Sequence, residues 1–180
     1  MKSKISQFHI GVSAEAFAAA MFARCGYDVS VQYGANQPEY DLIVAKDQNM
    51  MKVSVKGSQD GGWGLTQSYI ENADYHSAVD KWLLKHKAKT IFCLVQFKNT
   101  SINELPRIYL ATPKEIAKRL KDSSKGRGET ILYEYKEWTA QANGYGTIDR
   151  VPEEWLFSPS RIKQLIQESD DNYHVAGGSH

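Results

Sequence analysis

A pair of short apolar segments carrying isolated charges constrains the fold of this chain more than any other feature. Residues 38–58 read PEYDLIVAKDQNMMKVSVKGS and predict two strands joined by a polar turn at 46–49. Alternation places Ser54 and Lys56 on one face of the second strand, and pairing of the strands would bring Asp41 close to both. A carboxylate and a lysine in apolar strands are costly to desolvate. We therefore take this hairpin as the chemical centre of the chain.

Composition limits the class of protein. With 180 residues, the chain is long enough for one domain with a full core. The net charge of +1 gives no overall attraction to nucleic acid, so any such surface must be a local patch. Cys25 and Cys93 stand in apolar runs without a CxxC pairing, which predicts reduced core residues of a cytoplasmic protein. No apolar run approaches the ~18 residues of a spanning helix and no signal peptide is visible, so no membrane partner is expected.

The predicted elements alternate between helices and strands. In chain order they are a helix at 6–25 ending at Gly26, a strand at 28–32, the hairpin, a helix at 73–87 and a strand at 90–97. The glycines at 57, 61, 62 and 64 predict a loop between the hairpin and the second helix. Residues 90–97 are almost wholly apolar, which is typical of a central strand covered on both faces.

The second half continues this mixed pattern. We predict a strand at 107–111, a helix capped by Thr112 that runs to about 121, a strand at 130–135, and a helical region from Pro152 that breaks near Pro159. Residues 168–180 are polar and are expected to form a frayed tail. We therefore expect a single domain over 1–180, with a core at about 6–97 and a C-terminal extension at about 98–167.

The first predicted helix carries an unusual charge. Helical spacing puts Phe8, Val12, Ala19 and Phe22 on one apolar stripe, and Glu15 lies in the middle of it. One interpretation is a carboxylate at the helix edge that is solvated or hydrogen-bonded, since charged residues are rarely buried without a partner. The other is a carboxylate directed at the chemical centre.

Residues 38–41 (PEYD) and 54–56 (SVK) resemble the signature of the PD-(D/E)XK, or restriction-endonuclease-like, nuclease superfamily. That signature is an acid near the start of one strand, followed by an acid, any residue and a lysine on the next. This chain departs from it at Ser54, where the family usually has Glu, Asp or sometimes Gln. The predicted order of elements matches the αβββαβ core of the superfamily over about 6–97. The resemblance thus implies an α/β fold with a mixed central sheet flanked by helices.

The resemblance implies Mg²⁺- or Mn²⁺-dependent hydrolysis of DNA phosphodiester bonds by an endonuclease-like enzyme. Asp41 would be the principal metal ligand, the Val55 carbonyl a second, and Glu15 a third, directly or through water. Lys56 would orient or activate the attacking water, or steady the phosphate. Ser54 could hold the metal or a bound water, but without contributing a negative charge. The nearby acids Glu39 and Asp60 are candidates to compensate.

Several alternatives stay open. Without the resemblance, Asp41 and Lys56 would be interpreted as a simple ion pair at a strand edge. Ser54 and the near-neutral charge favour, as a rival function, a catalytically inactive nucleic-acid-binding module that kept the fold. A partner-binding protein with no nucleic-acid role is a third possibility. RNA in place of DNA is not excluded, and a homodimer follows only by analogy with dimeric family members.

Two regions are candidates for nucleic-acid contacts. The loop at 61–69 places Trp63 and Gln67 beyond the hairpin, where an aromatic ring could stack on a base or could instead cap the core. Between residues 114 and 127 the sequence is rich in basic side chains, and we take as a phosphate-contacting patch Lys118, Arg119, Lys125 and Arg127. A solvated helix face followed by a loop is the default interpretation of such a run.

Overall fold

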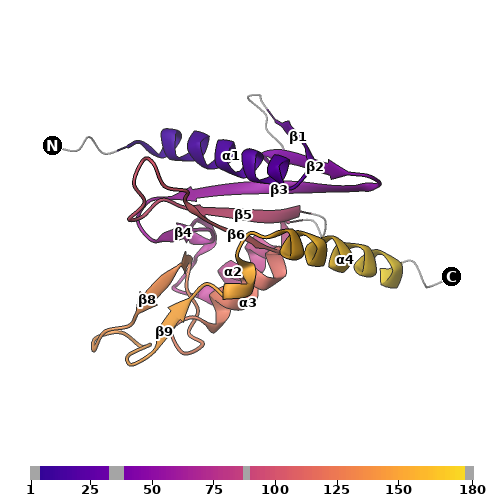
Figure 1. Ribbon diagram of the computed structural model, residues 1–180. Coiled ribbons are helices and arrows are strands. Elements are labelled where there is room, and N and C mark those ends of the chain that lie inside the picture. The colour runs from indigo at the N-terminus through magenta and orange to yellow at the C-terminus, as the bar shows by residue number, and fades with distance from the viewer. Residues whose placement is uncertain (1–4, 33–38, 87–89, 177–180) are drawn as a thin grey trace.

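A mixed β-sheet forms the centre of the protein (Figure 1). The computed structural model describes residues 5–32, 39–86 and 90–176, and for 169–176 the backbone alone. The five strands lie in the order β1 (Asp28–Val31), β2 (Leu42–Lys46), β3 (Asn49–Ser58), β5 (Thr90–Gln96) and β6 (Arg107–Ala111). β3 and β5 run parallel, and the other neighbours are antiparallel. The expected α/β class with a mixed sheet is confirmed.

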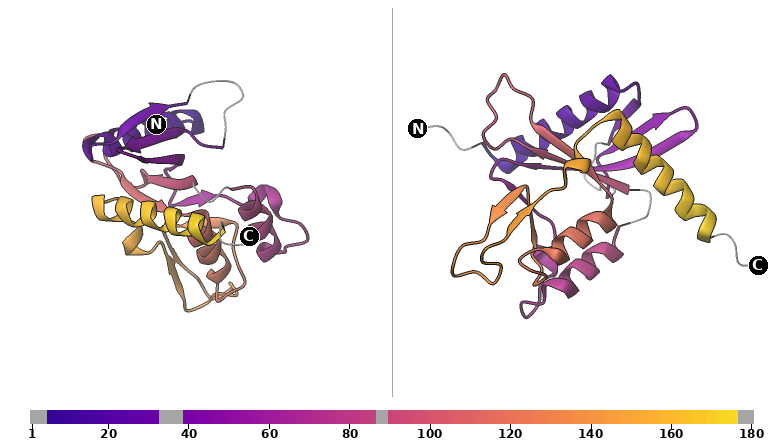
Figure 2. Two further views of the ribbon diagram at one scale, coloured as in Figure 1. Left: turned by 90° about the vertical axis from the view of Figure 1, so that its right-hand side faces the viewer. Right: turned by 60° about the horizontal axis from the view of Figure 1, so that its bottom comes forward.

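Helices cover both faces of the sheet. α1 (Gln7–Arg24) and α4 (Pro159–Ala176) enclose one apolar core, and α2 (Tyr75–Leu84) and α3 (Pro113–Asp122) enclose another on the opposite face (Figures 1 and 2). Members of the first core include Ala14, Phe22, Val53, Val55 and Ile162, and members of the second include Trp82, Phe92, Leu120 and Trp155. β5 has a core on each face, so every residue from Thr90 to Gln96 is buried. The prediction of a central, doubly covered strand is confirmed.

From α1 to β5 the chain contains the expected helix, three strands, helix and strand, but β4 (Gly62–Gly64) and a 3₁₀ helix (Gln67–Tyr69) are inserted between β3 and α2. The hairpin of β2 and β3 pairs Leu42 with Val53 and Lys46 with Asn49. Its turn contains Asp47, whose φ of 54° lies in the left-handed region that Asp tolerates better than most residues. The expected pairing of the two strands as a hairpin is therefore confirmed.

The expected apolar stripe of α1 is wrong in part, because Phe22 is buried and Ala19 packs on the core but Phe8 and Val12 do not. The buried residues are Ile10, Ala14, Ala18 and Phe22, whereas the Phe8 side chain is 74% exposed and Val12 is 51% exposed. Apolar residues surround α1 almost completely, so periodicity alone does not select the buried side. The choice is made by packing, because a Cβ added at Gly57 of β3 would lie 2.9 Å from both Ala14 Cβ and the Ile10 carbonyl oxygen. α1 approaches the sheet along its small residues.

The expected glycine-rich loop is partly strand. Gly57 belongs to β3, and Gly62–Gly64 forms β4, which pairs with β7 (Ile131–Tyr133). The strand expected at 130–135 is two strands, because β8 (Tyr135–Glu137) turns away to pair with β9 (Ile148–Arg150) in a hairpin that projects from the sheet (Figure 2). Two 3₁₀ helices complete the described chain, η1 (Gln67–Tyr69) and η2 (Glu153–Trp155).

The expected frayed tail is also incorrect in part, because the backbone of α4 stays helical to Ala176. The break near Pro159 is confirmed, since η2 precedes it and α4 begins there. Within the described residues, no helix combines the length and the apolar character needed to cross a bilayer.

The contact between α1 and Gly57 yields a stability prediction. Gly57→Ala should lower the free energy of unfolding by about 1–3 kcal/mol, because the added methyl would press on the backbone of Ile10 and force α1 away from β3. The matched control is Gly11→Ala, where nothing lies within 4 Å of the added Cβ and alanine favours the helix. Urea denaturation should show opposite signs for the two variants; equal stability would show that the close approach is not required.

Candidate functional site

The site lies at the N-terminal end of β2, beyond which its partner β3 extends. Pairing of the two strands ends at Leu42 and Val53, and among the described residues no strand pairs with 54–58 of β3 on this edge. Asp41, the residue before β2, lies at the start of this unpaired stretch of β3. Its N–H donates to the Val53 carbonyl at 2.8 Å, and its Oδ2 accepts a hydrogen bond from the Val55 N–H at 2.6 Å. The carboxylate is thus held by the Val55 N–H, which would otherwise donate to the backbone of a neighbouring strand. Pro38, the first residue of the sequence motif, lies outside the described residues.

The Val55 carbonyl, the expected second ligand, faces the same edge. In an extended strand, the N–H and C=O of one residue point to the same side. Because the Val55 N–H is directed at Asp41, its carbonyl oxygen is directed at that edge as well. The Val55 side chain lies in the core beneath α1, as the alternation predicts.

Glu15 reaches this edge from α1. It follows Ala14, which packs on Gly57 directly after Lys56. Burial is the main reason that the pKa of the Glu15 carboxyl lies above its ordinary value, and the negative charge of Asp41 raises it further, while the positive charge of Lys56 lowers it. The structure therefore brings Glu15, Asp41 and Lys56 into one electrostatic neighbourhood. We call these three residues the acid–lysine cluster.

Ser54 is not accessible at this edge. Its side chain is 2% exposed, and its register partner on β5 is the buried Phe92. Lys56, two residues further along, is exposed. Ser54 and Lys56 thus share one face of the strand, as the alternation predicts, but only Lys56 is accessible to solvent. The Ser54 hydroxyl is therefore shielded from bulk solvent.

A further residue of this region, His86, was missed by the sequence analysis. Its ring lies 4.5 Å from the Trp82 ring and 5.0 Å from that of Phe92, measured between centroids. Burial is the main cause of a lowered pKa, and the charges of Glu39 and Lys56 also act on the ring with opposite signs. Its Nδ1 is buried and has no hydrogen-bond partner among the described residues. His86 contacts Phe92, and Phe92 pairs with Ser54 in the sheet. Without that register, the sequence does not show that His86 lies near the site.

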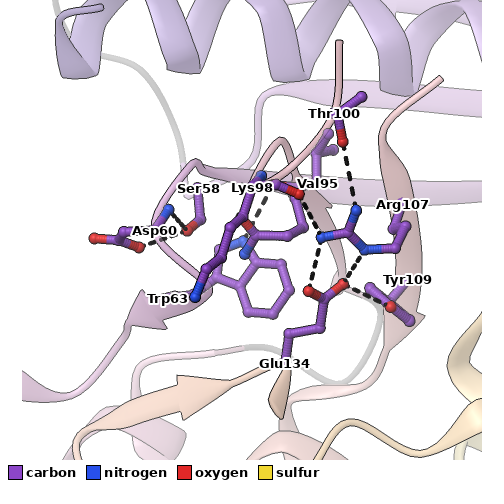
Figure 3. A network of polar contacts seen from close by, with 10 residues as sticks. Ser58, Asp60, Trp63, Val95, Lys98, Thr100, Arg107, Tyr109 and Glu134 are labelled. Atoms are coloured by element: carbon purple, nitrogen blue, oxygen red, sulfur yellow. Dashed lines mark hydrogen bonds and ion pairs between the residues drawn. The ribbon is translucent and has the colours of Figure 1, made fainter. Parts of the chain in front are cut away.

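An open cavity of about 510 Å³ adjoins Lys56. Its lining includes Gln7 of α1, Asp60 after β3, Gln67 of η1 and Tyr133 of β7. The Asp60 Oδ1 accepts a hydrogen bond from Ser58 Oγ at 2.8 Å (Figure 3). Gln67 thus lines the same cavity as Lys56.

Trp63 caps the core and does not present a stacking surface. Its side chain is 2% exposed. The indole Nε1–H donates to the Lys56 carbonyl at 3.0 Å. It also donates to the Val95 carbonyl at 3.3 Å (Figure 3). Of the two interpretations of Trp63, base stacking is therefore wrong. The residue instead supports the strand that carries Lys56.

Half of the expected basic patch is committed to internal contacts. Arg119 forms a short ion pair with the buried Asp149, which also accepts a hydrogen bond from Trp138 Nε1 at 2.6 Å. The Arg127 guanidinium lies 4.9 Å from the centre of the Tyr75 ring and pairs with Glu129. These two arginines hold the C-terminal extension together, so their assignment to phosphate contacts is not supported.

The lysines of the patch are more accessible. Lys118 is paired with Asp122 at 2.7 Å but its side chain remains 79% exposed, and Lys125 is exposed as well. Of the four residues of the expected patch, these two lysines thus remain accessible to a phosphate group.

The acids at the site do not form a dense metal cage. Among the described residues, no group of three or more His, Cys, Asp or Glu side chains is positioned to hold a metal ion. The oxygen donors at the edge of β3 are the two carboxylates of the acid–lysine cluster and the Val55 carbonyl. Comparison of the chain with protein-family models, with curated proteins and with solved structures finds no match.

The raised pKa of Glu15 predicts a pH-dependent effect on stability. A folded-state pKa above the unfolded value means that ionising Glu15 costs stability as the pH rises. Glu15→Gln should therefore raise the melting temperature at pH 7, and the gain should vanish below the ordinary glutamate pKa of ~4.3, where both side chains are neutral.

The control for this prediction is Glu104→Gln. The pKa of Glu104 is lowered by hydrogen bonding from Ser101, so removal of its charge should lower the melting temperature at pH 7. Thermal melts at pH 7 and pH 4 compare the two variants. A stability difference for Glu15→Gln that is negative at pH 7, or the same at both pH values, would contradict the prediction.

Proposed function

We propose that this protein hydrolyses DNA phosphodiester bonds with Mg²⁺ or Mn²⁺, as an endonuclease of the PD-(D/E)XK type. The observation that supports this function best is the acid–lysine cluster. Its members come from α1, from the residue before β2 and from β3, and the charges of Asp41 and Lys56 both act on the Glu15 carboxyl. Two acids beside one lysine at a strand edge would suit a metal ion and a phosphate group.

The oxygen donors at this edge fit a magnesium ion. Mg²⁺ prefers oxygen ligands and keeps several of its waters, so it needs few protein ligands. The negative charge of Asp41 disfavours ionisation of Glu15, and a divalent cation between the carboxylates would relieve that repulsion. The Val55 carbonyl, directed at the same edge, would be the third ligand. When bound, the ion would lower the pKa of a coordinated water and stabilise negative charge on the phosphate.

The side chains of the cluster would have distinct tasks. The hydrogen bond from the Val55 N–H fixes the orientation of the Asp41 carboxylate. Lys56 carries a compact charge on a flexible stem and is exposed, so it can approach an attacking water or a phosphate oxygen. Glu15 would complete the negative charge that Ser54, as a neutral and buried side chain, does not supply.

One observation favours the rival function of a catalytically inactive nucleic-acid-binding module. Ser54 is buried where the superfamily usually places an acid, and the described residues contain no denser group of metal ligands. Under this alternative, the protein would bind nucleic acid in a salt-dependent way without cleaving it.

Asp41→Ala tests the metal site. We expect calorimetric titration with Mn²⁺ to show binding to the wild type and none to the variant, with cleavage of plasmid DNA lost in parallel. Asp28→Ala, which removes an exposed acid from β1 of the same sheet, is the control and should bind Mn²⁺ normally. Mn²⁺ binding by Asp41→Ala equal to that of the wild type would exclude this edge as the metal site. Metal binding without cleavage by the wild type would favour the inactive module.

Lys56→Met separates binding from chemistry. The substitution keeps the apolar stem and removes the ammonium group, which is not a metal ligand. Mn²⁺ affinity should be retained, while the rate of plasmid cleavage should fall by roughly 10²–10⁴, as is usual for loss of a group that acts on the reacting proton. Lys52→Met is the matched control, because Lys52 lies on the same strand but over the Tyr40 ring. Cleavage by Lys56→Met at the wild-type rate would reduce this lysine to a structural role.

A further inference from the structure

We propose that the open cavity beside Lys56 binds the base of one unpaired nucleotide, so that the substrate is single-stranded or locally unpaired nucleic acid. This inference rests on the proposed function, because it assumes that a phosphate lies at the acid–lysine cluster. It adds a substrate class and a binding site to that function.

The position of the cavity supports the inference. Lys56 belongs both to the acid–lysine cluster and to the lining of the cavity, and the next residues of β3, Gly57 and Ser58, continue along its wall. A nucleotide chain with one phosphate beside Lys56 would therefore bring an adjacent base to the cavity.

The size of the cavity suits one base and not a duplex. Its volume of about 510 Å³ lies within the ~300–1,000 Å³ range of ordinary ligand pockets. The cube root of this volume is about 8 Å, so the cavity is too narrow for a B-form duplex, whose major groove alone is ~12 Å wide. Only a nucleotide that leaves the stack could enter.

The walls are closely packed, so the cavity is not a region of loose packing. A Cβ added at Gly62 would lie 2.7 Å from Ile131 Cγ2, and one added at Gly64 would collide with the Gln67 amide. The Asp60 carboxylate accepts a hydrogen bond from the Ser58 hydroxyl (Figure 3). It also accepts one from the Gly62 N–H at 3.4 Å. These contacts keep the loop after β3 in a defined shape.

The lining has the chemistry of base recognition more than of phosphate binding. Its charged residues within the described chain, Lys56 and Asp60, have opposite signs, so the cavity does not favour an anion. Three glutamines also line it: Gln7, Gln59 and Gln67. Each amide has donors and an acceptor, the combination with which glutamine pairs with base edges. The half-buried ring of Tyr133 adds an aromatic surface.

A base in a duplex would have to be flipped before it could enter. Flipping costs a few kcal/mol, and least where a base is already unpaired. The protein should therefore bind a single strand more tightly than a duplex of the same length, by about tenfold or more.

Gln7→Trp tests the cavity, because it places a large ring at its wall from an exposed position on α1. Ser13→Trp puts the same ring at another exposed position of the helix, outside the lining, and serves as the control. Fluorescence anisotropy in EDTA would measure binding of labelled dT₁₂, of labelled U₁₂ and of a labelled 12-base-pair DNA duplex. Circular dichroism melts would confirm that both variants fold.

We expect the wild type and Ser13→Trp to bind dT₁₂ at least tenfold more tightly than the duplex. Gln7→Trp should lose this preference through weaker dT₁₂ binding, while its duplex affinity stays unchanged. A parallel loss with U₁₂ would extend the substrate class to RNA. Equal wild-type affinity for dT₁₂ and the duplex, or equal dT₁₂ binding by Gln7→Trp and Ser13→Trp, would overturn the inference.

The two proposals fail in different ways. Asp41-dependent cleavage of plasmid DNA, with no effect of Gln7→Trp on dT₁₂ binding, would overturn the cavity alone. Cavity-dependent binding of dT₁₂, with no metal binding and no cleavage by the wild type, would support the base site and overturn the hydrolytic function.

Discussion

The close packing of α1 on β3 at Gly57 is the contact on which the candidate site depends. Because Gly57 has no Cβ, the helix backbone at Ile10 can lie directly against the strand. This contact fixes the height and the rotation of α1 over the sheet. It places Glu15 beside the end of β2, where its carboxyl experiences the charges of Asp41 and Lys56. A helix held further from the sheet would keep the apolar core but would separate the two acids.

The second constraint on the site is that β2 begins only at Leu42, so its pairing with β3 ends there. If β2 began before Leu42, the Val55 N–H would donate to its backbone. In this structure the Asp41 side chain accepts that hydrogen bond instead. One carboxylate therefore ends the pairing of two strands and becomes oriented by doing so. The edge left open is also where the Val55 carbonyl is directed. In this arrangement the open edge of β3 presents polar groups, while the Val55 N–H keeps a hydrogen-bond partner.

Much of this arrangement could be predicted from local patterns, and the rest depended on contacts between distant segments. Alternation located β2 and β3, because a period of two shows which side chains share a face, and a continuous apolar run located β5. The buried side of α1 could not be predicted, since Phe8 and Ala14 are both apolar and only Gly57 selects between them. The internal role of Arg119 depends on Asp149, thirty residues further along the chain. His86 could be placed only through the register of β5.

The hydrogen bond from Trp63 to the Lys56 carbonyl connects the candidate site to the rest of the molecule. The Trp63 ring meets the Tyr109 ring edge-on, and the Tyr109 hydroxyl donates to Glu134, which also receives two hydrogen bonds from Arg107. The backbone of the lysine is thus positioned by side chains from β4 and β6 and by the segment between β7 and β8. The C-terminal half of the chain, which lacks the nuclease-like signature, is for this reason part of the scaffold that aligns the site, and a fragment ending after β5 would lose that alignment.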